Sequence, residues 1–391
     1  MSFLFRPPPF HLLSPRPNMG KTAIVIGSGI VGLGITRALA NKGWKVTVFE
    51  RNPKPIGASI RNFGMVWPIG QELGPRYSRA MRTRSIWLEM SQKAGFWAEE
   101  TGSLHLAYTE LENQVIEEYV EKMAGFKSAT HLNPSQTQAK SPATVTKGLK
   151  GALWSEEEMI VDPREAIWKT AAFLQSLENV DFHWSRAISH IDGARVFSGK
   201  DSWTADQIFV CSGADFEMLY PELFDATSIT KCKLQMMRLV SQPEGWRIGP
   251  PLCAGLSFIH YRGFHVAESL GMLKSFYEEN HPDLMELGIH VMVSQNGKGQ
   301  LTIGDSHEYG RHLDPFDRED INQKIIAYLQ KFAAFKDWTL ESSWHGIYPK
   351  MTNGEAEFVH AVNPQVTIVN GLGGAGMTLS FGLAEELVEK L

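Results

Sequence analysis

A glycine-rich turn between two short apolar runs constrains this chain more than any other feature. Residues 23–26 are the run Ala-Ile-Val-Ile, typical of a buried parallel strand, and a turn with the spacing G-x-G-x-x-G follows directly. Residues 30–39 then carry apolar side chains at helical spacing, and Gly43 stands where that helix would stop. Residues 45–49 alternate like a second strand, which ends in Glu50. Together these patterns predict a strand–turn–helix–strand unit.

Each part of this unit has a physical role in binding a dinucleotide. Gly27 permits the tight turn, Gly29 lets the backbone approach a pyrophosphate, and Gly32 lets the helix pack closely against the strand. The helix N-terminus offers free N–H groups and a partial positive charge to the phosphates. Glu50 follows the turn by about 20 residues, the position from which a carboxylate bonds a ribose hydroxyl. The residues of this unit predicted to bind the cofactor are Gly27, Ser28, Gly29, Ile30, Val31, Gly32, Glu50 and Arg51.

The composition argues against several other classes of protein. The chain has 391 residues, of which 43% are hydrophobic and 21% charged, enough for two or three ordinary globular domains. A net charge of −5 argues against a nucleic-acid partner. The three cysteines, Cys211, Cys232 and Cys253, are far apart, so we expect no disulfide framework and no metal site. No apolar run approaches the length of a membrane span, and we expect a protein of the reducing cytoplasm without stable membrane insertion.

The first 18 residues differ in character from the rest. Prolines at positions 7–9, 15 and 17 would break any helix, and the segment lacks the apolar stretch of a signal peptide. Met19 stands just before the first predicted strand. We therefore expect residues 1–18 to be a disordered tail or a misassigned start.

Two later segments end in small residues and are predicted to approach the same cofactor. Residues 205–214 form a strand pattern whose end leaves room for a ligand. Residues 366–369 predict another strand, followed by a second G-x-G-x-x-G turn and a helix over 377–389. This sequence has no further strand or ribose-binding acid after that turn, so we expect it to serve the first motif's cofactor. The cofactor contacts predicted here are Ser212, Gly213, Gly371, Gly373, Gly374, Gly376, Met377 and Thr378.

The middle of the chain supports a second sheet. Residues 233–240, 252–260, 289–294 and 300–304 alternate or run apolar, and we predict that they form antiparallel strands. The acidic run 156–158 is predicted to be exposed.

Together, the first motif with Glu50, the 205–214 strand and the second glycine turn resemble the superfamily of D-amino-acid oxidase and glycine oxidase. The resemblance extends over residues 19–391 and implies an enzyme that uses FAD to oxidise C–N bonds. It implies an α/β fold in which a Rossmann-like FAD-binding domain adjoins a substrate domain built on a mixed, largely antiparallel sheet. The implied FAD-binding domain comprises residues 19–100, 150–230 and 355–391, and the implied substrate domain comprises residues 101–149 and 231–354.

Two further stretches narrow the resemblance to a bacterial subgroup linked to phosphonate breakdown. They are residues 57–71, GASIRNFGMVWPIGQ, and residues 304–309, GDSHEY. The proposed substrates of that subgroup are aminophosphonates similar to 2-aminoethylphosphonate. By the resemblance, the first stretch lies beside the flavin ring, and His307 in the second lies near the flavin or the substrate. The residues of the first stretch expected at the cofactor are Ser59, Asn62, Phe63 and Gly64, with Arg61 and Asn62 also expected at the catalytic centre.

One position departs from the family pattern. Amino-acid oxidases of this kind carry a Gly-x-Arg-Pro sequence whose arginine pairs with the substrate carboxylate, and here the matching residues 346–349 read Gly-Ile-Tyr-Pro. Tyr348 therefore replaces the arginine, and a tyrosine cannot form a bidentate ion pair. An anionic group must then be held elsewhere. The candidates are Lys350, Arg61, Arg262 and His345.

These observations predict an FAD-dependent enzyme that oxidises a small anionic amine, giving an imine and then an aldehyde. The reduced flavin would pass its electrons to oxygen or to another acceptor. Four alternatives stay open: a nicotinamide dehydrogenase, a glycine or sarcosine oxidase, a D-amino-acid oxidase, and a flavin-binding subunit of a larger amine dehydrogenase. A yellow protein would exclude the first alternative, and turnover by the isolated chain would exclude the last.

Overall fold

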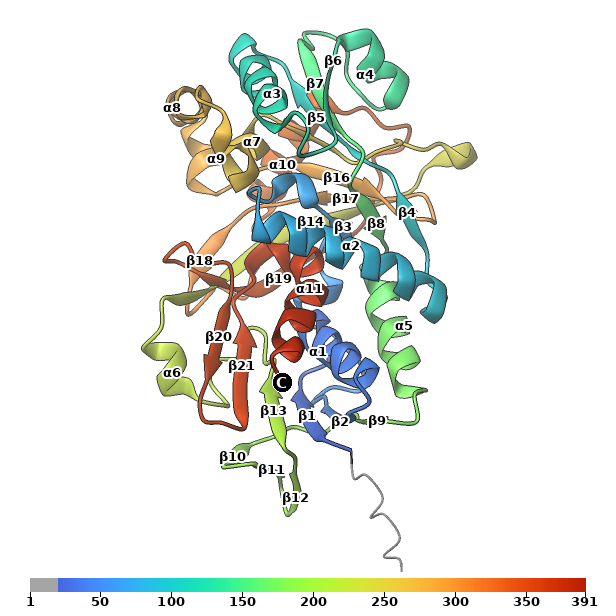
Figure 1. Ribbon diagram of the computed structural model, residues 1–391. Helices are drawn as coiled ribbons and strands as arrows, with labels where there is room; N and C mark the ends of the chain where they lie inside the picture. Colours follow the sequence, from blue (N-terminus) through green and yellow to red (C-terminus); the bar gives the residue numbers. More distant parts are fainter. Residues whose placement is uncertain (1–19) are drawn as a thin grey trace, which may run out of the picture.

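The computed structural model of the protein describes residues 20–391, and the predicted tail or misassigned start, residues 1–18, lies outside them. Figure 1 shows a mostly parallel sheet in the lower half of the molecule and a larger sheet in the upper half. Helices cover the parallel sheet on one face. This arrangement confirms the α/β fold class predicted from the sequence.

The parallel sheet has six strands and holds the glycine-rich unit at its centre. Its order from edge to edge is Phe358–Ala361 (β20), Val366–Asn370 (β21), Gln207–Val210 (β13), Thr22–Ile26 (β1), Lys45–Phe49 (β2) and Val180–His183 (β9). All neighbours pair in parallel except β20, which runs antiparallel to β21. The two strands that lead into the glycine turns, β1 and β21, lie on either side of β13 and run parallel to it, so both turns follow carboxyl ends at the same edge of the sheet.

The burial of β1 explains why its sequence reads as a continuous apolar run. Ala23 and Val25 pack into the core on the helical face, whereas Ile24 and Ile26 pack into the core on the other face. A parallel strand that is covered on both faces needs apolar side chains at every position.

The helices of the lower half assemble around the first glycine turn. The helix that follows this turn (α1) packs against the C-terminal helix (α11), and α11 packs against α2. The helices are Ile30–Asn41 (α1), Pro75–Ala94 (α2), Glu110–Met123 (α3), Pro134–Lys140 (α4), Pro163–Gln175 (α5), Pro221–Asp225 (α6), Leu256–His260 (α7), Leu270–Asn280 (α8), Pro282–Glu286 (α9), Glu319–Phe332 (α10) and Gly376–Glu389 (α11). Short 3₁₀ turns occur at Ala58–Ile60 (η1), Pro68–Gly70 (η2), Pro243–Gly245 (η3), Arg262–Val266 (η4) and Gly373–Ala375 (η5).

The upper sheet has nine strands and is largely antiparallel, as predicted. Its order is Glu308–Gly310 (β18), Ile229–Ser241 (β14), Gln300–Gly304 (β17), Met292–Gln295 (β16), Leu252–Ala254 (β15), Ser103–Ala107 (β5), Gly151–Ser155 (β7) and Ala129–Leu132 (β6), with Leu340–Met351 (β19) paired to β14. Only β15 and β5 pair in parallel. The strand β7 belongs to this sheet although the domain division predicted from the resemblance places residues 150–230 with the cofactor. Two three-stranded sheets complete the fold: Met65–Val66 (β3), Met159–Val161 (β8) and Ala98–Glu100 (β4), and His190–Asp192 (β10), Arg195–Ser198 (β11) and Asp201–Thr204 (β12).

The strand predicted over residues 252–260 is wrong in its second half. The chain leaves β15 at Gly255 and forms the short helix α7. A Cβ atom at Gly255 would lie only 2.0 Å from the Tyr277 hydroxyl and 2.3 Å from a Glu112 carboxylate oxygen. Only glycine therefore permits this turn against the neighbouring helices, and the turn places His260 at the end of α7.

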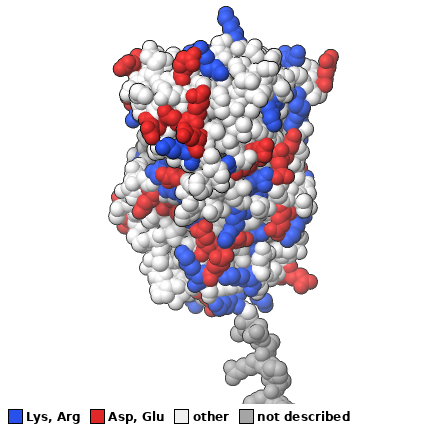
Figure 2. All heavy atoms as spheres, turned by 45° about the horizontal axis from the view of Figure 1, so that its top comes forward, with Lys and Arg blue, Asp and Glu red and all other residues white. Residues whose placement is uncertain are grey.

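Positive and negative side chains are interspersed on the face of the molecule that Figure 2 presents. In Figure 2 lysine and arginine side chains alternate with aspartate and glutamate side chains over the face presented. Within residues 20–391, none of the helices combines the length and the apolar character that crossing a membrane requires.

The acidic run 156–158 is not uniformly exposed, and the prediction is wrong for two of its members. Glu157 and Glu158 are only 9% and 0% exposed. The Glu158 carboxylate accepts hydrogen bonds from the Ile69 N–H group and the Ser103 hydroxyl, each at 2.9 Å. Burial raises the pKa of Glu158 to about 6.

We expect Glu158→Gln to reduce the pH dependence of stability. Because the pKa of Glu158 is about 6 in the folded protein and 4.5 is its ordinary value, its contribution to stability is complete at low pH and is lost as the pH rises through 6. This difference in pKa corresponds to about 2 kcal/mol. When the pH is raised from about 4 to about 7, the free energy of unfolding should therefore fall by about 2 kcal/mol more in the wild type than in Glu158→Gln. Urea unfolding at both pH values measures this, with the exposed Glu156→Gln as the control. Equal losses in wild type and Glu158→Gln would contradict the prediction.

Candidate active site

The first glycine turn is closed so tightly that side chains are excluded from it. Gly27 has a φ of +102°, and a Cβ atom there would lie 2.3 Å from the carbonyl oxygen of Cys211. A Cβ atom at Gly32 would lie 1.9 Å from the carbonyl oxygen of Gly27. The helix α1 therefore starts directly above the end of β1, and its N-terminus carries the partial positive charge that favours an anion. The N–H of Ile30, at this N-terminus, donates to the hydroxyl of Ser59 at 2.9 Å.

Glu50 is held rigidly beside this turn. One carboxylate oxygen accepts hydrogen bonds from the backbone N–H and the hydroxyl of Ser28, at 3.0 and 2.9 Å. The other accepts from the backbone and side-chain N–H groups of Asn52, at 3.0 and 2.9 Å. The N–H of Ser28 is thus used to orient Glu50, and the carboxylate is fixed at the position from which we predict that it binds a ribose.

The second glycine turn lies between the first turn and the upper sheet. A Cβ atom at Gly376 would lie 3.7 Å from Ile30, at the start of α1. A Cβ atom at Gly374 would lie 3.6 Å from the hydroxyl of Tyr348, and one at Gly373 would lie 3.5 Å from the side chain of Lys350. The turn therefore connects the first glycine motif to Tyr348, which replaces the family's arginine, and to Lys350, one of the candidates for holding an anionic group.

The segment over residues 57–67 is fastened by its own side chains. The Asn62 amide donates to the carbonyl groups of Ala58 and Ser59 and accepts from the N–H of Gly64 at 2.8 Å. Both polar atoms of Asn62 are thereby used to shape the loop, so the structure gives this predicted catalytic residue a positioning contact. Arg61 donates to the carbonyl oxygen of His345 at 3.2 Å and links the loop to β19.

A cavity of about 1030 Å³ joins these parts and extends from the parallel sheet to the upper sheet. Its volume is at the top of the range of roughly 300–1000 Å³ for small-molecule sites, so a dinucleotide and a small substrate can share it. It is lined by most of the predicted site residues: Gly27, Gly29, Ile30, Val31, Glu50, Arg51, Ser59, Arg61, Asn62, Phe63, Ser212, Gly213, His307, Tyr348, Lys350, Gly371, Gly373, Gly374, Gly376, Met377 and Thr378. The predicted residues Ser28, Gly32 and Gly64 do not line it and support the turns from behind.

The chain fits FAD at this cavity. The Ser212 hydroxyl is buried and has no hydrogen-bond partner within the described chain, at a position that lines the cavity. Such a group requires a partner, and a bound polar ligand would supply it. The side-chain-free cradle at Gly27 and Gly29, beside the N-terminus of α1, suits a pyrophosphate.

Tyr348 and Lys350 mark the upper end of the cavity. Burial raises the pKa of Tyr348 well above its usual range, so its hydroxyl stays neutral. The ammonium group of Lys350 donates to the Tyr309 hydroxyl at 2.8 Å, and burial lowers its pKa. A partly buried cation beside a neutral hydroxyl can hold an anionic group there.

Of the other anion-binding candidates, Arg262 lines the cavity and His345 does not. Arg262 lines the cavity and lies 3.8 Å from Glu72, which compensates part of its charge. His345 does not line the cavity, and its ring pairs with Asp317 at 2.8 Å instead. We therefore remove His345 from the candidates, because its ring is committed to a carboxylate outside the cavity.

Sequence reasoning placed His307 near the flavin or the substrate, but it did not find that His260 and His290 form a cluster with His307 at this end of the cavity. His260, His290 and His307 line it together with Tyr261 and Asp305. Their ring centroids lie 3.7 to 5.0 Å apart. No spacing motif relates residues that come from α7, from the approach to β16 and from the segment after β17. The resemblance pointed to His307, but no sequence signal joined His260 and His290 to it.

The comparisons with known proteins agree with this geometry. The family described as FAD dependent oxidoreductase, DAO, matches residues 22–390. The structure of glycine oxidase from Bacillus cereus ATCC 14579 is similar with a TM-score of 0.74 at 16% identity, covering 95% of this chain and 94% of that chain. L-Proline dehydrogenase from P. horikoshii gives a TM-score of 0.73 at 19% identity, covering 95% and 92% of the two chains. At these identities the similarity shows the shared fold.

A curated relative matches over a shorter stretch. The tRNA 5-methylaminomethyl-2-thiouridine biosynthesis bifunctional protein MnmC of Azoarcus sp. (strain BH72) is 31% identical over 111 residues, which are 27% of this chain and 18% of that protein. The alignment thus spans less than a fifth of the relative's length. The family match, by contrast, extends over nearly the whole described chain. This chain therefore belongs to the family of FAD dependent oxidoreductases, and FAD is its cofactor.

Proposed function

We propose that this enzyme oxidises the C–N bond of a small anionic amine, an aminophosphonate such as 2-aminoethylphosphonate or its N-methyl derivative. When bound, FAD supplies the oxidant that takes a hydride equivalent from the carbon beside the amine. The residues of the chain hold the anionic group, orient the amine and exclude water. The imine that results is hydrolysed to an aldehyde.

The observation that carries this proposal is the pair Tyr348 and Lys350 beside the second glycine turn. Tyr348 stands where the resemblance calls for an arginine, and its hydroxyl can donate one hydrogen bond but cannot pair with both oxygens of a planar carboxylate. The ammonium group of Lys350 is a compact point charge on a flexible stem, which suits the three oxygens of a phosphonate. This end of the cavity therefore has a positive charge, that of Lys350, but lacks the guanidinium group that would pair with both oxygens of a carboxylate.

Anaerobic bleaching of the flavin absorption band tests this proposal. The holoenzyme is mixed without oxygen with 2-aminoethylphosphonate, its N-methyl form, glycine, sarcosine and D-alanine in separate reactions. Bleaching by the phosphonates alone is the expected result. Bleaching by glycine, sarcosine or D-alanine instead would replace the proposal with the amino-acid oxidase alternative. If none of the five bleaches the flavin, the proposal fails, and a subunit of a larger dehydrogenase becomes the better interpretation.

We expect Tyr348→Arg to shift the preference toward carboxylates. The new guanidinium would gain a charged hydrogen-bond pair with sarcosine or glycine, about 1.5–3 kcal/mol, or roughly 10- to 150-fold in relative kcat/KM. The measurement is the ratio of kcat/KM for sarcosine to that for N-methyl-2-aminoethylphosphonate. Tyr348→Phe keeps the ring without the charge and is the matched control, and flavin content verifies that both variants fold. An unchanged ratio in Tyr348→Arg would remove this residue from the substrate site.

A further inference from the structure

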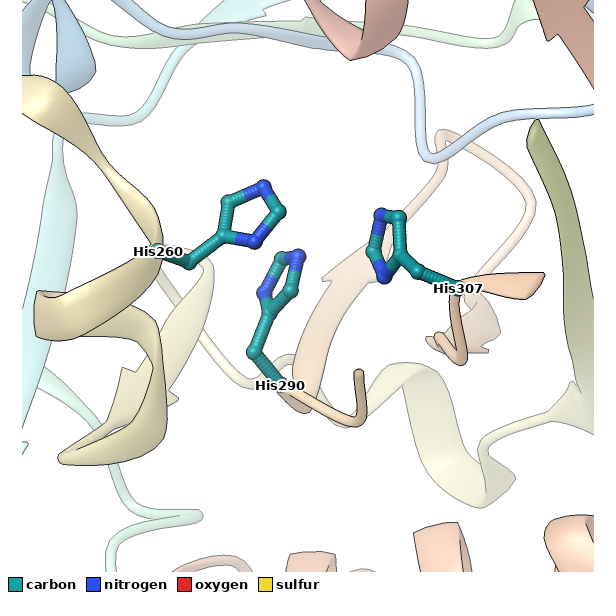
Figure 3. A group of neighbouring side chains, drawn as sticks. All are labelled: His260, His290 and His307. Carbon is teal, nitrogen blue, oxygen red and sulfur yellow. The ribbon is translucent and has the colours of Figure 1, made fainter. Parts of the chain in front are cut away.

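The three cavity histidines converge from separate elements. His260 ends α7, His290 precedes β16, and His307 follows β17. One ring nitrogen of each lies within 4.8 Å of a ring nitrogen of the other two. Figure 3 shows the three rings turned toward one another across a common space. The set of three imidazoles is the donor set of many zinc sites that keep one open position.

The polar neighbours of two of these rings are of the kinds found beside metal-binding histidines: a carbonyl group hydrogen-bonded to His307 and a carboxylate close to His290. The Nδ1 atom of His307 donates to the carbonyl oxygen of Gly288 at 2.9 Å, which leaves Nε2 with a free lone pair. The Nε2 atom of His290 lies 3.4 Å from the carboxylate of Asp305, and its buried Nδ1 has no partner within the described chain. Histidines that bind a metal regularly give their second N–H group to a carbonyl or a carboxylate in this way.

The charge balance also suits a cation. His290 and His307 are 4% and 5% exposed, an environment that favours the neutral imidazole, which is the form that binds a metal. The buried Oδ1 of Asp305 makes no hydrogen bond within the described residues, although Nε2 of His290 lies 3.4 Å away, and burial raises the pKa of Asp305 well above its usual range. A divalent ion at the histidines would compensate this carboxylate. Lys350, the positive group that faces the cluster, opposes the ion and would be offset by an anionic ligand between them.

The centroid spacing of two of the three ring pairs matches that of imidazoles on one tetrahedral ion. With Zn–N distances of about 2.0–2.1 Å, two imidazoles on one tetrahedral ion have centroids roughly 5 Å apart. The pairs His290–His307 and His260–His307 are separated by 5.0 and 4.9 Å. The pair His260–His290 is closer, at 3.7 Å, so His260 must turn away from His290. His260 can turn, because it is exposed to the cavity and its ring has no hydrogen bond within the described chain.

We propose that His260, His290 and His307 bind one zinc ion whose fourth position opens into the cavity. Asp305 is the carboxylate that orients His290 toward this ion. The open position lies at the Lys350 end of the cavity, where zinc and the ammonium group would share the oxygens of a phosphonate. This last step rests on the proposed function, whereas the metal site itself does not.

Zinc binding to the holoenzyme tests the site without any substrate. The purified protein is treated with a chelator, dialysed against zinc-buffered solutions, and analysed for zinc and flavin by elemental and absorption measurements. We expect one zinc ion per flavin in the wild type. His260→Ala should raise the zinc Kd at least about 100-fold, and Asp305→Asn should raise it about 10- to 100-fold. His190→Ala, an exposed histidine on β10, is the matched control and should bind zinc like the wild type.

The outcomes separate the two proposals. His260 is exposed to the cavity, so His260→Ala should keep its FAD, and flavin content verifies folding. Zinc that binds equally to wild type and His260→Ala, or no zinc bound to the wild type, would overturn the site. Site-specific zinc binding without flavin bleaching by phosphonates would support the metal site and reject the proposed substrate. The opposite result is a protein that binds no zinc but whose flavin is bleached by phosphonates. That result would support the proposed substrate and reject the metal site.

Discussion

Gly32→Ala is expected to give a protein that no longer retains FAD. The added Cβ atom would lie 1.9 Å from the carbonyl oxygen of Gly27 and 3.0 Å from its carbonyl carbon, both backbone atoms of the turn that we predict to cradle the pyrophosphate. Backbone cannot rotate away as a side chain does, so α1 must move off the end of β1. Such a displacement costs about 1–3 kcal/mol or more in stability. It also removes charged hydrogen bonds to the phosphates, and losing about 3 kcal/mol weakens FAD binding roughly 100-fold.

Flavin absorption per chain after gel filtration and the Kd for FAD measure this effect. Gly271→Ala is the matched control, because Gly271 lies in α8 and an added Cβ atom there meets nothing within 4 Å. That variant should retain FAD and be more stable by about 0.5–1 kcal/mol. Gly32→Ala with a full complement of FAD and an unchanged Kd would show that the turn is not the cofactor cradle.

Lys350→Met should reduce kcat/KM for the aminophosphonate roughly 30- to 1000-fold. Removing the charged partner of a buried ionic contact costs about 2–4 kcal/mol. Burial lowers the pKa of Lys350, so the wild-type kcat/KM should also fall as the pH rises and the ammonium group loses its proton. The variant should lose this alkaline limb together with its activity.

Steady-state kinetics over a pH series, with flavin content as the folding check, measure both effects. Lys350→Arg keeps the charge and should retain much of the activity. Lys331→Met removes an equivalent charge in α10, away from the cavity, and should behave like the wild type. Unchanged kinetics in Lys350→Met would place the anionic group elsewhere and return attention to Arg262.

The cofactor half of the site was predictable because its determinants are local in sequence. The strand, the glycine turn and the helix over residues 22–41 are encoded by spacing within one short segment, and the structure places each within one or two residues of its predicted position. The second glycine turn was recognisable for the same reason. The closeness of this turn to Tyr348 was not predictable, because Gly374 and Tyr348 belong to segments that only the folded sheet brings together.

The errors occurred where tertiary contacts overrule local pattern. Residues 256–260 have the apolar character of a strand, but close packing of Gly255 against Tyr277 turns the chain into α7. Glu158 has the composition of a surface residue, but two hydrogen-bond donors in the core hold its carboxylate. In both cases the deciding partner is far away in sequence, so no window along the chain contains it.

The sequence by itself determined that this chain binds a dinucleotide, since a glycine turn between two strands admits a pyrophosphate through spacing alone. Only the tertiary structure decided which side chains meet at the upper end of the cavity. The three histidines, His260, His290 and His307, lie within 47 residues of one another in the sequence but come from different segments of the fold. Lys350 approaches them from β19. Their convergence depends on strand order and on the turn at Gly255, which side-chain type and spacing along the chain do not encode.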